Sequence, residues 1–311
     1  MQLQPLLEAT IHQYVAPHAH VTHWEPLNLA AQGFSGAAVA RYRVTYTTPD
    51  GSTHQTSLVT KEAGLLERRA VTHLGAQKLG VPWSYTPDLE TDAPFLLCQQ
   101  DVTPTAHPGR AALLHSGARR LAAIHAAHLG KRSALPWLPL ADASFFTDHI
   151  LADWRGNWQQ NLRDPVFQQE YADVIPAIEA AVPTFTRVME DFWADHAHHT
   201  LISTDFSPVH LLFHEGDAFI IDWGGPRYGS LYLDLPNVFG PDDVRAYHTA
   251  LREFGVHIPT AEFMERYRQA GHYFGIKYMS FALWSWRNGG QRRIEVTPYL
   301  RYTIQCALHG G

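Results

Sequence analysis

Two aspartates in the segment 203–223 have the spacing of a phosphoryl-transfer site. Asp205 lies in a short polar stretch, and Asp222 follows 17 residues later, after two apolar runs separated by a turn at Gly216. This order predicts a loop, a strand, a tight turn and a second strand. Because a hairpin brings its two ends together, we expect Asp205 and Asp222 to face one small volume. Two such carboxylates suit a metal-assisted transfer, in which one orients an attacking hydroxyl and the other holds the cation that bridges nucleotide phosphates.

The segment resembles the catalytic region of the aminoglycoside phosphotransferase and choline kinase group of kinase-like small-molecule phosphotransferases. Members of that group carry a catalytic loop H-G-D-x-x-x-x-N, a hairpin, I-D-W or a close relative, and a segment like G-D-P-x-x-D-L. Asp205 matches the loop aspartate and Asp222 the metal-binding aspartate. The other matching residues are Pro208, Trp223, Gly229, Tyr232, Asp234 and Leu235. The resemblance implies that Asp205 orients the substrate hydroxyl and accepts its proton, and that Asp222 binds the metal.

Three positions of the loop depart from the family pattern. Ser203 stands where the family has histidine, Thr204 where it has glycine, and His210 where it has the metal-binding asparagine. Mg²⁺ prefers oxygen ligands, whereas imidazole nitrogen favours softer or transition metals. Three interpretations stay open: one metal held mainly by Asp222, a shifted preference such as Mn²⁺, or a site that binds nucleotide but transfers phosphate poorly. His210 would either occupy the second metal-ligand position or replace that metal by its own hydrogen bonding.

The first hundred residues contain strand patterns that would position a nucleotide. Alternating runs at 39–46 and 57–61 flank a turn at 49–51, which predicts a hairpin. Before it lies a small-residue loop, 32–38, whose backbone amides have unobstructed access to phosphates. The candidate residues in this loop are Gly33, Ser35 and Gly36.

Lys61 ends the second strand of that hairpin. In kinase-like folds a strand lysine contacts the α- and β-phosphates and is held by a glutamate of the following helix, because a flexible charge needs a partner. Glu67, in the next helical run, is the candidate partner. Further on, the apolar run 95–98 leads into a polar segment with the character of a hinge between lobes. The backbone near Gln99 and Gln100 is a candidate contact for an adenine edge.

The remainder of the chain is expected to be mostly helical. Helical spacing of apolar residues occurs in the segments 110–129, 180–196, 242–255 and 260–286. We therefore expect an α+β protein-kinase-like fold with two lobes. Residues 1–101 would form an N-terminal nucleotide-binding lobe built on an antiparallel sheet, and residues 102–311 a mainly helical catalytic and substrate lobe.

Aromatic residues recur at helical spacing near the C-terminus, at Phe274, Tyr278, Phe281, Trp284 and Trp286. Such a stripe is typical of a buried helix face. The alternative is a ligand cage, since choline kinases use aromatic rings to hold a quaternary ammonium by cation–π attraction. The acceptor therefore stays open between an aminoglycoside, an amino alcohol, a sugar and a related compound.

Composition excludes several classes of protein. The chain has 311 residues, of which 45% are hydrophobic and 17% charged, which is typical of a soluble globular protein. Its net charge of −6 argues against nucleic acid as a partner. No apolar run is long enough for a membrane span and the N-terminus lacks a signal-peptide pattern, so we expect no membrane partner and a cytoplasmic location. Two cysteines, Cys98 and Cys306, provide no disulfide framework.

Together these patterns predict an ATP-dependent phosphotransferase that acts on a hydroxyl group of a small molecule, with Mg²⁺ or Mn²⁺ as its metal. The alternative is a nucleotide-binding pseudokinase with a regulatory or scaffold role. Ser203, Thr204 and His210 support this alternative, because they leave only part of the loop pattern intact. The sequence leaves the oligomeric state open.

Overall fold

The computed structural model divides the chain into two compact units. It describes residues 3–28, 38–104, 109–290 and 293–311. Unit 1 comprises residues 1–124 and 207–226, and unit 2 comprises residues 125–206 and 227–311. The two units are compact groups of residues, and their boundaries differ from the predicted boundary at residue 101. The division into a nucleotide-binding lobe, 1–101, and a catalytic and substrate lobe, 102–311, stays a prediction. Each unit is described by itself.

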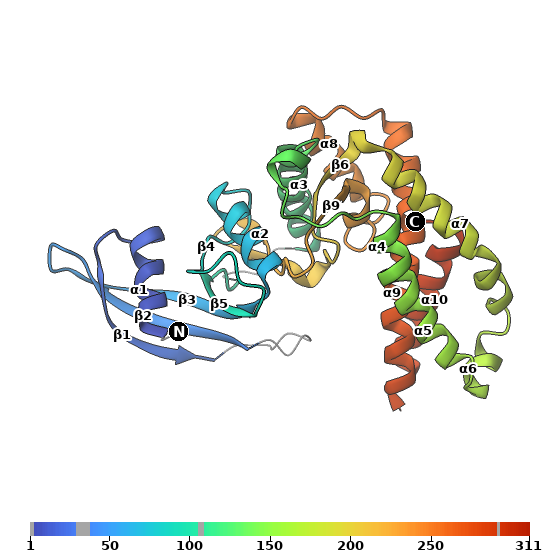
Figure 1. The fold of residues 1–311 in the computed structure, drawn as a ribbon, viewed down its shortest axis with the longest axis horizontal. Helices are drawn as coiled ribbons and strands as arrows, with labels where there is room; N and C mark the ends of the chain where they lie inside the picture. The colour runs from blue at the N-terminus through green and yellow to red at the C-terminus, as the bar shows by residue number, and fades with distance from the viewer. Residues whose placement is uncertain (1–2, 29–37, 105–108, 291–292) are drawn as a thin grey trace. The chain divides into compact units, whose positions relative to one another are not determined.

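Unit 1 is built on a five-stranded antiparallel sheet in the order β1-β2-β3-β5-β4 (Figure 1). The strands are β1 His20–Leu27, β2 Val39–Thr47, β3 Thr53–Ala63, β4 Ser84–Tyr85 and β5 Phe95–Gln100. The predicted hairpin is confirmed as β2 and β3, and Gly51 in its turn has φ +85°, where glycine carries no steric penalty. The predicted antiparallel sheet in the N-terminal region is therefore correct.

Two helices accompany this sheet and fix its central strand. Helix α1, Leu3–Tyr14, buries Leu6 and Ile11 against sheet residues that include Val44 and Leu58. Helix α2, Leu65–Ala76, follows β3 directly. Burial of these apolar side chains stabilises the platform that carries Lys61 near the end of β3.

A second ribbon in unit 1 confirms the hairpin predicted between the two aspartates. Strand β7, Leu211–His214, pairs antiparallel with β8, Asp217–Ile220. Glu215 and Gly216 between them have φ of +50° and +91°. Positive φ at both central residues is the geometry of a type I′ turn, which matches the twist of the two strands.

The hairpin is anchored on the part of helix α3, Arg110–His128, that belongs to unit 1. Asp217 accepts a hydrogen bond from the Ser116 hydroxyl at 3.0 Å and pairs with Arg120. The Ile220 N–H donates to the carbonyl of Gly80 at 2.8 Å. These contacts explain why the hairpin belongs to the same compact unit as the N-terminal sheet.

Unit 2 is mainly helical. Its helices include α4 Ala143–Phe145, α5 Ala152–Asn161, α6 Pro165–Glu170, α7 Ile175–Ala194, α8 Val244–Glu253, α9 Thr260–Asn288 and α10 Arg293–His309. Short turns of helix are η1 Arg132–Ala134, η2 Phe146–Leu151, η3 His196–His198 and η5 Leu231–Asp234, with η4 Pro208–His210 in unit 1. The predicted helical C-terminal part is confirmed.

Helix α9 is the organising element of unit 2. It packs against α5, α7 and α10 (Figure 1). A Cβ at Gly275 would lie 2.2 Å from the backbone nitrogen of Ala307, so glycine permits the close approach of α10. Strand β6, His199–Ile202, pairs with β9, Arg227–Ser230. None of the helices in the described part of the chain is both long and apolar enough to cross a membrane.

Candidate active site

Lys61 lies between two carboxylates in unit 1. Its Nζ is 2.8 Å from Glu67 Oε1 and 2.8 Å from Asp222 Oδ1. Strand β3 supplies the lysine, the first turn of α2 supplies the glutamate, and Asp222 follows β8. The expected pairing of Lys61 with Glu67 is thus present, and the fold adds a carboxylate from 161 residues further along the chain.

The electrostatics of this cluster favour a charged lysine. Burial opposes the charge on Lys61, but the carboxylates of Glu67 and Asp222 raise the pKa of Lys61 above its ordinary value. Burial also raises the pKa of Glu67, against the opposing effect of Lys61. Glu67 lies in the first turn of α2, where the helix dipole favours negative charge. The result is an ammonium group fixed in place, which can neutralise the charge of a phosphate.

Asp222 has a backbone conformation that its neighbours enforce. Its φ is +61°, a left-handed conformation that costs a non-glycine residue on the order of 1–2 kcal/mol. Next to it, Trp223 is fully buried and donates from Nε1 to the carbonyl of Ile220 at 3.2 Å. The Ile221 N–H donates to the carbonyl of His210 at 3.0 Å. This bond brings His210 beside Asp222, with Nε2 3.5 Å from Asp222 Oδ2.

The donor set beside Asp222 fits a Mg²⁺ ion held partly by nucleotide. Mg²⁺ in kinases is bound through one or two carboxylates together with substrate phosphates and water. Asp222 offers such a carboxylate, with 42% of its side chain exposed. Among the described residues, no group of three or more histidine, cysteine or acidic side chains could hold a metal by itself. A metal here would therefore be held mainly by Asp222, because the His210 nitrogen is a poor match for Mg²⁺.

Asp205 lies in unit 2, on a loop that is held by a buried carboxylate. The N–H groups of Ser203 and Thr204 donate to the two oxygens of Asp234, at 2.7 and 2.8 Å. The Asp234 side chain, at the end of η5, is fully buried. A buried carboxylate needs such donors. Asp234 was matched to the last segment of the family pattern with no role. In the structure Asp234 anchors the loop before Asp205.

Thr204 shows why the family pattern has glycine at this position. Its φ is +62°, a region that glycine occupies without cost and that is an outlier for a β-branched residue. The Thr204 peptide is nevertheless held at both ends, because its N–H donates to Asp234 and its carbonyl accepts a hydrogen bond from Lys277. These two contacts hold Thr204 in a conformation that glycine would adopt without cost.

Two residues of α9 hold the carboxylate of Asp205. The Tyr278 hydroxyl donates to Asp205 Oδ1 at 3.0 Å, and Lys277 Nζ lies 3.2 Å from the same oxygen. Lys277 was not among the residues predicted for the site, and Tyr278 was expected in a stripe typical of a buried helix face. No spacing rule joins residues that are 72 and 73 positions apart. The Asp205 side chain keeps 56% of its surface exposed.

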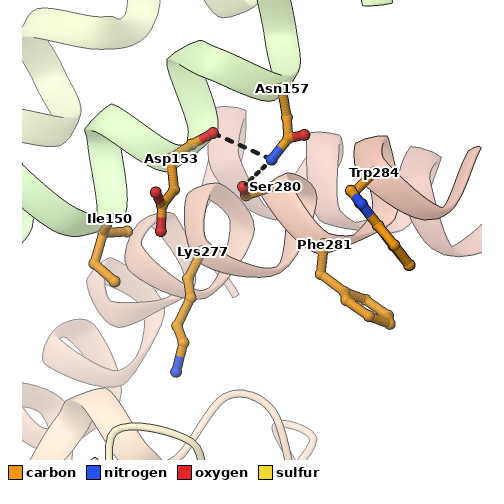
Figure 2. A pocket seen from close by; sticks show the side chains of 7 residues that line it. All are labelled: Ile150, Asp153, Asn157, Lys277, Ser280, Phe281 and Trp284. Atoms are coloured by element: carbon orange, nitrogen blue, oxygen red, sulfur yellow. Dashed lines mark hydrogen bonds between the residues drawn. The ribbon is translucent and has the colours of Figure 1, made fainter. Parts of the chain in front are cut away.

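A groove beside Lys277 runs between α5 and α9 (Figure 2). Its volume is about 310 Å³. It is lined by Ile150, Asp153, Asn157, Lys277, Ser280, Phe281 and Trp284. Phe281 and Trp284 are 51% and 52% exposed, so the prediction of a buried aromatic stripe is wrong for this pair. It is correct for Phe274 and Trp286, which are buried. Phe274 and Phe281 are seven residues apart and share a face of α9, and Phe274 is in contact with the Tyr302 ring of α10, whereas Phe281 lines the open groove.

The other predicted site residues have mixed outcomes. The loop residues Gly33, Ser35 and Gly36 lie outside the described residues. Gln99 and Gln100 lie on β5 between β3 and β4, and the Gln100 N–H donates to the carbonyl of Trp83 at 2.9 Å. Pairing within the sheet thus occupies this donor, and the adenine contact stays a prediction. Asp205 and Asp222 fall in different units, so their convergence also stays a prediction.

Comparison with solved structures identifies the fold. The chain superposes on spectinomycin phosphotransferase in complex with ADP and spectinomycin with a TM-score of 0.57, at 16% identity over 99% of this chain and 98% of that one. The chain has a kinase-like phosphotransferase fold. An aminoglycoside phosphotransferase from Alicyclobacillus acidocaldarius gives a TM-score of 0.53 at 14% identity, covering 98% of this chain and 97% of that one.

A third structure with this kinase-like fold is an ethanolamine kinase from Plasmodium vivax. Its TM-score is 0.54 at 10% identity, with 91% of this chain and 81% of that chain covered. No family model matches the chain, and no curated protein is similar to it in sequence. At these identities the likeness establishes the fold, and the chemistry must be argued from the residues of the site.

Proposed function

We propose that the protein is an ATP-dependent phosphotransferase that acts on a hydroxyl group of a small molecule. The observation that carries this proposal is the placement of Lys61 Nζ at 2.8 Å from both Glu67 and Asp222. Three charged side chains from separate parts of the chain meet at this place. Such a cluster suits the binding of a charged ligand. A fixed ammonium beside an exposed carboxylate suits the phosphates of a nucleotide and an accompanying cation.

Transfer would proceed by direct displacement at the γ-phosphorus of ATP. The oxygen of the acceptor hydroxyl forms the new bond to phosphorus, and the bond from phosphorus to the β,γ-bridging oxygen breaks, so that ADP leaves with the electron pair. Asp205 orients the acceptor hydroxyl and takes its proton. Lys61 neutralises phosphate charge, while Glu67 keeps Lys61 in place. A magnesium ion held by Asp222 would supply further neutralisation of the phosphate oxygens when bound.

The groove between α5 and α9 is the proposed binding site for the acceptor. This choice rests on Lys277, which lines the groove and also contacts Asp205. Asp153 and the exposed rings of Phe281 and Trp284 line the same groove (Figure 2). A carboxylate close to exposed aromatic faces attracts organic cations. We therefore expect an acceptor with an amino group next to its hydroxyl groups.

A transfer assay tests this function. ATP and Mg²⁺ or Mn²⁺ are incubated with amino alcohols, aminocyclitols and neutral sugars, and formation of ADP and of phosphorylated acceptor is measured. The proposal expects transfer to at least one amine-bearing alcohol in the parent and strong loss of transfer in Asp205→Asn. Failure of every acceptor, in a protein that still binds ATP, would contradict it.

The pseudokinase alternative has one observation in its favour. His210 Nε2 lies 3.5 Å from Asp222 Oδ2, where the imidazole would replace a metal ion by its own hydrogen bonding. Under this alternative ATP binds without metal, and His210→Asn weakens that binding. Under the enzyme proposal His210→Asn supplies an oxygen ligand, and the response to Mg²⁺ increases.

A further inference from the structure

Thr204 is the point of highest backbone strain in the loop before Asp205. A β-branched residue at φ +62° costs on the order of 1–2 kcal/mol relative to glycine. Such a conformation persists only if surrounding contacts over-determine it. Asp234 fixes the N–H side of this residue and Lys277 fixes its carbonyl side. The conformation of the loop thus depends on a donor from α9.

Lys277 is an unusual residue to find in this position. Its side chain is only 17% exposed, and burial of an ammonium group is costly unless it is paired and hydrogen-bonded. Burial lowers the pKa of Lys277, while Asp205 and Asp234 oppose that shift. The Nζ atom also lies 5.0 Å from the centre of the Tyr278 ring. An apolar residue would fill this space without such a cost, so the charge has a role of its own.

The contacts of Lys277 indicate what that role is. One reaches the carbonyl of Thr204 and another the Oδ1 atom of Asp205. Tyr278 donates to the same oxygen, Oδ1. Two donors on one oxygen fix the rotation of the carboxylate. The carbonyl contact differs in kind, because it acts on the backbone that carries the carboxylate.

We propose that Lys277 is a positioning residue that holds Asp205 in its reactive orientation by bracing the left-handed Thr204 peptide. It makes a threonine tolerable where similar loops have glycine. The inference rests on the proposed function of Asp205 in phosphoryl transfer. If Lys277 acts through the Thr204 backbone, the effects of substitutions at Lys277 and Thr204 will depend on each other. If Lys277 acts only through its charge on Asp205, they will be independent.

A double-mutant cycle tests that coupling. Lys277→Met keeps the length of the side chain and removes the donor, so Thr204 is expected to leave the left-handed region and displace Asp205. A displacement of this kind lowers kcat by roughly ten- to a hundredfold, with the KM for ATP nearly unchanged. Thr204→Gly in the Lys277→Met background restores much of kcat, because glycine holds the same conformation without a brace. The acceptor in this assay is one found by the transfer screen.

Tyr278→Phe is the matched control. It removes the other donor to Asp205 Oδ1 and leaves the Thr204 carbonyl contact in place. Thr204→Gly is therefore expected to give no rescue of Tyr278→Phe. Equal rescue of both variants, no rescue of Lys277→Met, or a parental kcat in Lys277→Met would each overturn the proposal.

Hydrogen exchange separates this proposal from the proposed function. Exchange in the peptide that spans residues 203–206 is measured by mass spectrometry, with near-ultraviolet circular dichroism as a check on the fold. Faster exchange in Lys277→Met and unchanged exchange in Tyr278→Phe would support the brace even if the parent transfers no phosphate. Unchanged exchange in both variants would overturn the brace, whatever the activity.

Discussion

The loop of Asp205 and the loop of Asp222 each contain a non-glycine residue in the left-handed conformation, and different contacts stabilise it in each. Asp222 and Thr204 have nearly equal φ values, +61° and +62°, and neither is glycine. The Asp222 conformation is secured by its hairpin and its immediate neighbours. The loop of Asp205 is secured by Asp234 and Lys277, which belong to later segments of the chain. One loop is thus built from local contacts and the other from long-range contacts.

The difference extends to what each carboxylate contacts. Asp222 faces the ammonium group of Lys61 and the imidazole of His210, and we expect a bound nucleotide and its cation to contact the same carboxylate. Asp205 accepts hydrogen bonds from two donors on one oxygen, an arrangement that fixes the orientation of its carboxylate. We therefore expect substitutions in the first region to change nucleotide affinity and those in the second to change turnover or loop stability.

Asp205→Asn is expected to have the largest effect. Removal of a positioned proton acceptor lowers turnover by on the order of a hundredfold or more, while the amide retains the shape of the side chain. The affinity for ATP, measured by calorimetry, should equal that of the parent. Parental turnover, or a loss that lies mainly in ATP affinity, would break the contrast between the two loops.

Asp234→Asn should mainly lower stability. One of its two oxygens becomes an NH₂ group, which leaves a buried N–H of Ser203 or Thr204 without a charged acceptor. We expect the free energy of unfolding to fall by about 2 kcal/mol. Urea denaturation measures this, with the exposed Asp242→Asn as a control that should change little. A variant as stable as the parent would show that the loop has another anchor.

Lys61→Met is expected to weaken ATP binding by about tenfold, which corresponds to roughly 1.4 kcal/mol. The reason is the loss of the ammonium group that pairs with both Glu67 and Asp222 and that is proposed to neutralise phosphate charge. Glu67→Gln is the companion variant and should have a smaller effect, since it loosens the lysine without removing it. Calorimetry that gives parental affinity for Lys61→Met would remove this cluster from the nucleotide site.

Thr204→Gly should have the smallest effect and the opposite sign. Relief of left-handed strain exceeds the greater flexibility of glycine in the unfolded chain, so the free energy of unfolding rises by about 0.5 kcal/mol. Glu215→Gly, at φ +50° in the hairpin turn, is the matched variant and should behave alike. A clear loss of stability in Thr204→Gly alone would mean that its side chain has a structural role.

What the sequence could predict follows the same division between local and long-range contacts. Both hairpins, the helical C-terminal part and the pairing of Lys61 with Glu67 depend on neighbouring residues and short turns, and each is present. The role of Lys277 depends on how α9 packs against a loop far away in sequence, which no periodicity encodes. For the same reason the short strand β4, which occupies the Gln100 N–H, was not foreseen.

The proposed function requires that Asp222 couple a metal ion to nucleotide binding. The direct test is calorimetric titration of the parent and of Asp222→Asn with ATP, in Mg²⁺, in Mn²⁺ and in a chelator. Asparagine tolerates the left-handed conformation, so the backbone is expected to stay as it is. We expect metal to strengthen ATP binding in the parent by at least about tenfold and to have no such effect in Asp222→Asn. Equal affinity of the parent in metal and in chelator, or a metal response that survives in Asp222→Asn, would contradict it.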